Sequence, residues 1–216
     1  MAIVARISLG SNFPAQFNND VEREIVKKIK SNADKIKTKI TDQIKKHVRE
    51  ALVGTQEYQS IIHGKLRAEL GIPNSSARIM SVIDTWIDNI VVKVVASQSP
   101  FLSITIGMIQ ADYADVLGLP DAQYTYKSRR SEGTIPWLKW LLLEGDKRII
   151  TQYEFSKNPI GSRTGMGIMI SRERGVWQVP SEFSGTSVNN FATRALGNIE
   201  SVIDKIVENT IKGSLK

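Results

Sequence analysis

The chain has 216 residues, and this length allows either one domain or a folded body with an extended arm. Its apolar share of 41% excludes wholesale disorder, and the absence of cysteine excludes disulfides, thiolate chemistry and any zinc site that needs sulfur. The net charge is +7, with no long uncharged apolar run and no signal-peptide pattern, so we expect neither a membrane span nor export.

The first 18 residues are predicted to form an extended arm. Residues Ala5–Leu9 alternate between apolar and polar types, which is typical of a short strand. Gly10 ends that strand, and Pro14 keeps the following stretch extended. A helical segment over 19–72 comes next.

One long amphipathic helix is predicted from Asn19 or Asp20 to near Gly54, because apolar residues recur there at every third or fourth position. The apolar stripe is narrow and consists mostly of isoleucine, while the other faces are rich in lysine. A helix of this kind suits packing on a body or on a neighbouring subunit. Ile25, Ile29, Ile36, Ile40 and Ile44 are therefore candidates for inter-subunit contact, and packing on the chain's own body is the alternative.

A second helix is predicted from Thr55 to Leu70, where Gly71 and then Pro73 stop it. An α+β body over 73–213 follows. It begins with a third helix from Asn74 or Ser75, which gives way to a strand at Val91–Val95.

The rest of the body alternates between strands and connections. We predict a strand at Phe101–Ile109, an irregular connection over Tyr113–Ser128, and a short helix from Pro136 to near Gly145. Three further strands are expected, at Arg148–Phe155, Gly167–Ser171 and Val176–Val179.

A flexible loop at Gly161–Gly167 and a hairpin turn at Arg172–Gly175 separate those strands. A closing helix is predicted from Thr186 or Ser187 to Gly213. The fold class is therefore α+β, with a long N-terminal helix and further helices packed on a small, mostly antiparallel sheet, and a helix closing the chain.

The sequence offers little for catalysis. Its two histidines, His47 and His63, lie in separate predicted helices, with His63 expected to be partly buried, and no histidine pair has a metal-binding spacing. The Gly161–Gly167 loop is rich in glycine, as phosphate-binding loops are, but it lacks the Gly-Lys-Ser/Thr sequence of a nucleotide-binding site. Asp84 and Asp88 lie one helical turn apart, as on an ordinary solvated face. We predict no catalytic, metal or cofactor site, and no enzyme.

A binding surface is a stronger prospect. Lys127, Arg129 and Arg130 follow Tyr124 and Tyr126, which combines cations and aromatic rings as nucleic-acid backbones and bases favour. With Arg163, the three basic residues are candidates for contact with DNA or a partner; a solvated loop with two anchoring tyrosines is the plain alternative. Because acidic residues are interspersed among the basic ones along the chain, we expect the electrostatic field around the protein to be moderate and patchy.

Short motifs stand out in the last third of the sequence, in the segments Trp137–Gly145, Ile160–Gly167, Trp177–Thr186 and Asn189–Ala195. They include an Arg-Thr-Gly element at Arg163–Gly165, a Glu-x-x-Gly-Thr-like turn within Glu182–Thr186, and an Arg-Ala pair at Arg194–Ala195 in the predicted closing helix. In these motifs the chain resembles the neck and tail-completion proteins of tailed bacteriophages. The order of elements agrees over the whole chain, but the residue detail is confined to Trp137–Ala195.

This resemblance implies a virion structural protein of the head-to-tail neck, assembled in the host cytoplasm. Such a subunit is expected to form a closed ring, because a ring arises when one patch meets a different patch on the next copy and the rotation closes. The resemblance implies six-fold or twelve-fold symmetry. Its implied neighbours are the portal or adaptor and the tail tube or tail terminator. Non-specific contact with packaged DNA is also implied, and no membrane contact.

Two other classes of function stay open. One is a sequence-independent nucleic-acid-binding module that uses the basic aromatic loop, and it requires salt-sensitive binding. The other is an enzyme that acts through Asp84 and Asp88.

Overall fold

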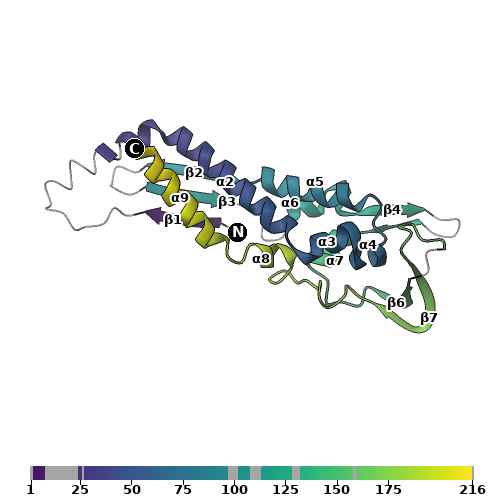
Figure 1. Cartoon of the computed structure of the whole chain (residues 1–216). Helices are drawn as coiled ribbons and strands as arrows, with labels where there is room; N and C mark the ends of the chain where they lie inside the picture. Colours follow the sequence, from purple (N-terminus) through teal and green to yellow (C-terminus); the bar gives the residue numbers. More distant parts are fainter. Residues whose placement is uncertain are drawn as a thin grey trace. The chain divides into compact units, whose positions relative to one another are not determined.

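The computed structural model describes residues 2–7, 24–25, 27–96, 102–107, 113–127, 132–157 and 160–215 (Figure 1). Helices combine with small antiparallel sheets, so the predicted α+β class is confirmed. The strands that the structure describes, however, form three separate sheets instead of one. The chain forms two compact units, and each combines segments that are distant in sequence. The first unit contains Met1–Val48, Ile87–Ile109 and Asn198–Lys216, and the second contains Arg49–Trp86 and Gln110–Gly197.

The first unit contains a three-stranded antiparallel sheet in the order β1-β3-β2. These strands are β1 (Ala2–Ile7), β2 (Val91–Ala96) and β3 (Leu102–Gly107). The predicted N-terminal strand exists, but it pairs with β3 along its whole length, so these six residues belong to a sheet and not to a free arm. The remainder of the predicted arm, 8–18, lies outside the described residues.

Helix α2 (Ala33–Val53) continues the helical residues 27–31, since the Ile36 amide bonds to the Asn32 carbonyl at 2.9 Å. Its isoleucine stripe is buried by the chain itself: Ile29 is 6% exposed, Ile36 2%, and Ile40 and Ile44 0%. Ile25 is half-buried. The inter-subunit role expected for this stripe is therefore corrected, because the four buried side chains are core residues of their own chain.

Helix α9 (Ile199–Leu215) completes the first unit. It buries Ile203 and Val207, and the Thr210 hydroxyl lies 3.4 Å from the Gln43 side-chain oxygen on α2. The closing helix thus begins later than predicted. It also continues through Gly213, where a Cβ atom would meet nothing within 4 Å.

The second unit begins with two helices where one was predicted: α3 (Gln56–His63) and α4 (Lys65–Leu70). Gly64 separates them, because a Cβ at this position would lie 2.8 Å from the Ser60 Cα. Both predicted ends are confirmed. The Thr55 hydroxyl accepts the Tyr58 amide at 3.2 Å, and Gly71 closes α4 with a φ of 62°.

Helix α5 (Ser75–Asp88) begins as predicted. Its Trp86 is fully buried and packs against Tyr113 and Phe191, with ring centroids 6.4 and 5.7 Å away. This aromatic cluster joins three segments far apart in sequence and forms part of the core of the second unit.

The predicted irregular connection is wrong, because this stretch is folded. It contains α6 (Ala114–Leu117), a 3₁₀ turn η1 (Pro120–Ala122) and strand β4 (Tyr124–Lys127), which pairs with β5 (Glu132–Ile135). Long-range bonds hold it: the Arg78 guanidinium donates to the Pro120 and Gln123 carbonyls at 3.1 and 2.8 Å. Helix α7 (Trp137–Leu142) follows at the predicted place.

Strands β6 (Ile150–Ser156) and β7 (Ile168–Trp177) form an antiparallel hairpin. The turn predicted at Arg172–Gly175 is wrong, since these residues lie inside β7 as a bulge opposite Gln152 alone. Gly175 permits it, because a Cβ there would lie 2.7 Å from the Tyr153 backbone. Helix α8 (Phe191–Ala195) then begins at an Asn190 cap and not at Thr186 or Ser187.

Candidate functional site

Arg163 lies on the two tyrosines of β4. Its guanidinium carbon is 5.3 Å from the Tyr124 ring centroid and 5.7 Å from that of Tyr126, and Nη2 donates to the Tyr124 hydroxyl at 2.9 Å. The strand presents both tyrosines together, because alternate residues of a strand share one side. The structure therefore brings the glycine-rich loop and the basic aromatic segment, two motifs far apart in sequence, to one place.

The surroundings of Arg163 are fixed on both sides. In its own loop, the Ser162 hydroxyl accepts the amides of Thr164 and Gly167 at 3.3 and 3.1 Å. Across from it, the Tyr124 hydroxyl donates to the Leu70 carbonyl at 2.6 Å. Burial raises the pKa of the Tyr124 hydroxyl, and the charge of Arg163 opposes that rise. Gly71 leaves space for the Arg163 guanidinium, since a Cβ at position 71 would lie 2.7 Å from Arg163 Nη2.

Part of the Arg163 guanidinium remains available. The side chain is exposed, and its other N–H groups have no hydrogen-bond acceptor among the described residues. Lys127 ends β4, where its backbone pairs with Glu132. Of the predicted contact residues, Arg129 and Arg130 lie outside the described residues, as does the Lys127 side chain. The arrangement is chemically suited to an anionic group, which the fixed Arg163 guanidinium and the adjoining tyrosine ring could contact.

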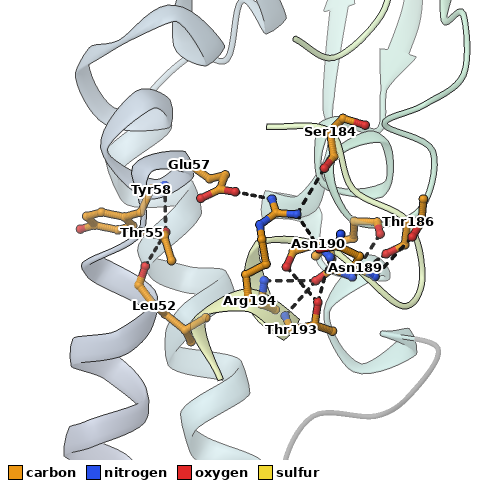
Figure 2. Close-up of polar contacts among 12 residues, drawn as sticks. Leu52, Thr55, Glu57, Tyr58, Ser184, Thr186, Asn189, Asn190, Thr193 and Arg194 are labelled. Atoms are coloured by element: carbon orange, nitrogen blue, oxygen red, sulfur yellow. Dashed lines mark hydrogen bonds and ion pairs between the residues drawn. The ribbon is translucent and has the colours of Figure 1, made fainter. Parts of the chain in front are cut away.

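A second polar centre surrounds Asn190, which is fully buried (Figure 2). Its oxygen accepts the amides of Ala192 and Thr193 at 3.1 and 3.2 Å, which caps α8. Its nitrogen donates to the Tyr113 hydroxyl at 2.7 Å, and to the carbonyls of Leu142 and Thr186 at 3.2 and 2.8 Å. One side chain thus connects four segments of the second unit, which is a structural role.

Arg194, one helical turn further on, forms an ion pair with Glu57 (Figure 2). It also donates to the Asn189 side chain at 3.0 Å. Glu57 is only 6% exposed, so the arginine neutralises a buried carboxylate and ties α8 to α3. The sequence did not predict the role of Glu57, because no local pattern indicates an ion pair with a residue 137 positions away. The Asn190-x-x-Thr193 spacing of a capping box was a readable signal for the start of α8.

Glu69 and Glu182 form a third polar cluster with Lys65. The Lys65 ammonium lies 3.1 Å from Glu182 and 3.9 Å from Glu69, and the Trp177 indole donates to Glu69 at 3.1 Å. Burial raises the pKa of Glu69, although the bond from Trp177 and the charge of Lys65 oppose the rise. A hydrogen bond from its own backbone and one from Lys65 lower the pKa of Glu182. The cluster fastens the turn after β7 to α4.

The paired aspartates show no arrangement for acid/base catalysis. Asp84 lies 2.6 Å from Arg49, and Asp88 lies 3.6 Å from Lys45, so each carboxylate has its own cation on α2. His47 and His63 are both exposed, which corrects the expectation that His63 is partly buried. Within the described ranges, no group of three or more potential metal ligands comes together.

Among the helical residues described, none forms a segment long and apolar enough to cross a membrane. In comparisons with known proteins, no family model, no curated protein and no solved structure matches the chain.

Proposed function

We propose that the chain is a structural subunit of the head-to-tail neck of a tailed bacteriophage. In this proposal identical copies form a closed ring between the portal or adaptor and the tail, and they act by shape and contact without catalysing a reaction. The proposal rests on the sequence resemblance, and on what the residues that carry it do in the fold.

The observation that supports it most is the use of the shared motifs as structural ties. Arg163 is bound to Tyr124, Glu182 to Lys65 and Arg194 to Glu57, each across a long stretch of sequence. The Gly185 carbonyl also accepts the Gly145 amide at 2.9 Å. Residues that make these contacts hold the folded body in one shape, as a ring-building protein needs. Because their polar groups are used in these contacts, they support a structural role for the motifs.

Because the isoleucine stripe of α2 is buried, the ring contacts must use other surfaces. Most of the large apolar side chains that the structure shows exposed lie on the β6–β7 hairpin or in the loops beside it. We expect these to contact the neighbouring copy, since burying them gives each contact a hydrophobic gain. They are Tyr153, Ile160, Val176 and Val188.

Electron microscopy of virions carrying a tagged copy of the chain tests this function. We expect the tag to form a ring of density between head and tail. Tag density on the capsid surface or the tail fibres, or a tagged chain that stays in the host lysate and never joins particles, contradicts the proposal.

A sequence-independent nucleic-acid-binding module is a second candidate function, and the position of Arg163 favours it. The held cation and the ring of Tyr126 lie at the base of the segment that continues into Arg129 and Arg130. Replacing Arg163 by Gln should then weaken DNA binding and lower its salt dependence in a gel-shift assay. Unchanged binding by that variant removes this candidate.

A further inference from the structure

The positive charge of the chain is concentrated in one short stretch. Residues 27–46 contain eight lysines and two aspartates, a net charge of +6, against +7 for all 216 residues. Acidic residues are interspersed along the whole chain, but only Asp34 and Asp42 lie in this stretch. The remaining 196 residues are close to neutral, and one helix carries nearly all of the excess.

These lysines form a continuous face on α2 and the turns before it, which we call the lysine face. Positions 28, 35, 39 and 46 are spaced by seven, four and seven residues, so they lie along one side of the helix. All four are exposed. Lys30 and Lys37 are also exposed but lie on the other side of the isoleucine stripe, about half a turn around the helix. From residue 27 to residue 46 the helix extends over about 28 Å.

Four of these eight lysines have no ion-pair partner among the residues that the structure describes. Lys27 lies 3.6 Å from Glu24, and Lys45 lies 3.6 Å from Asp88. Lys30, Lys35, Lys37 and Lys39 form no ion pair with any residue that the structure describes. A dense set of exposed ammonium groups, of which Lys35 and Lys39 at the centre of the face have no ion-pair partner in the described part of the chain, attracts a partner with repeated negative charge.

We propose that the lysine face binds the phosphate backbone of nucleic acid without reading its sequence. Each lysine is a compact point charge, and each phosphate contact releases condensed counterions, which supplies the affinity. The face offers ammonium groups without the aromatic rings or arginine forks that recognise bases. This inference concerns the first unit alone and does not depend on the ring proposed above or on Arg163.

A lipid surface is the main competing polyanion, and the burial of the isoleucine stripe argues against it. A helix that lies on a membrane inserts an apolar face among the acyl chains while its lysines contact the headgroups. On α2 the apolar side is occupied, because Ile36, Ile40 and Ile44 are at most 2% exposed. The helix therefore has charge to offer but no free apolar face to insert.

The full-length chain can be tested by fluorescence anisotropy with a labelled DNA duplex of arbitrary sequence. We compare the wild type with the double variant Lys35→Gln/Lys39→Gln between about 50 and 200 mM salt. The slope of log affinity against log salt should decrease in magnitude by about 1.8, since each lost contact removes about 0.9. Affinity at 0.1 M salt should fall by at least about tenfold.

The matched control is Lys157→Gln/Lys205→Gln, which removes the same charge from two exposed lysines outside the lysine face. It should leave the slope unchanged. An equal loss in this control overturns the proposal, because binding would then follow net charge alone.

Two further results also overturn it. The first is a loss of DNA binding in Arg163→Gln with none in Lys35→Gln/Lys39→Gln, which assigns the contact to the basic aromatic segment. The second is binding to vesicles that contain phosphatidylserine without binding to duplex DNA, which assigns the face to a membrane. Circular dichroism spectra that match the wild type show that each variant is folded.

Discussion

The two units use their charged side chains in different ways. In the second unit, charged side chains join separate helices and turns. Glu57 on α3 pairs with Arg194 on α8, and Lys65 on α4 pairs with Glu182 in the turn after β7. In the first unit, α2 exposes lysines such as Lys35 and Lys39 that pair with nothing in the described part of the chain. Charge in the second unit therefore holds the fold together, whereas Lys35 and Lys39 on α2 are available to act on something outside the chain.

The largest loss of stability is expected from Asn190→Ala. The change removes the cap of α8 and leaves the Tyr113 hydroxyl, the buried Leu142 carbonyl and the part-buried Thr186 carbonyl without their donor. We expect the free energy of unfolding to fall by about 3 to 5 kcal/mol, measured by urea denaturation. The exposed neighbour is the control: Asn189→Ala should cost less than about 1 kcal/mol. Similar losses for the two would contradict the central position given to Asn190.

Glu57→Ala should have the next largest effect. It leaves Arg194 without its carboxylate, and we expect a cost of about 2 kcal/mol, because the 37% exposed arginine regains some water. The exposed pair Glu154–Arg172 offers a comparison at 2.6 Å, where Glu154→Ala should cost less than about 1 kcal/mol.

A double-mutant cycle isolates the buried pair. Glu57→Ala combined with Arg194→Met should show an interaction energy of at least about 1 kcal/mol. If the two single costs simply add, the ion pair does not hold α3 to α8.

How far the sequence predicted this fold depended on where each signal lies. Thr55, Gly71 and the start of α5 are local signals, and the helix boundaries there were right. Strand β4 was missed because a bond that holds it joins the Tyr124 hydroxyl to the Leu70 carbonyl, 54 residues away. The bulge in β7 was mistaken for a turn, since Gly175 permits either and only the register with β6 decides.

The candidate sites show the same limit. Periodicity identified the isoleucine stripe of α2 but could not say whether the covering surface belongs to the same chain. Arg163 was singled out in the sequence, yet its seat on Tyr124 and Tyr126 depends on a fold that brings residues 39 positions apart together.

Glu69→Gln tests the second unit through pH. Burial raises the pKa of Glu69 in the folded chain, so between the unfolded and the folded pKa the folded state binds more protons than the unfolded state. The wild type should therefore lose stability as pH rises from the unfolded pKa through the folded pKa. Gln keeps an acceptor for the Trp177 indole, and the variant should lack this decline and be slightly more stable at neutral pH. A decline of equal size in the variant would show that another group causes it.

The smallest effect is expected from Lys35→Gln/Lys39→Gln. Both side chains are exposed, and glutamine is a good helix former, so the free energy of unfolding should change by less than about 0.5 kcal/mol. Thermal denaturation followed by circular dichroism measures this. A larger loss would mean that these lysines serve the fold, and the contrast between the two units would fail.

The most direct measurement for the proposed function is quantitative mass spectrometry of purified tailed particles. A neck-ring subunit predicts that the chain is present in every particle at a fixed copy number, equal to one closed ring of identical subunits. Its absence from particles that retain both head and tail, while it remains abundant in the lysate, would contradict a place in the neck.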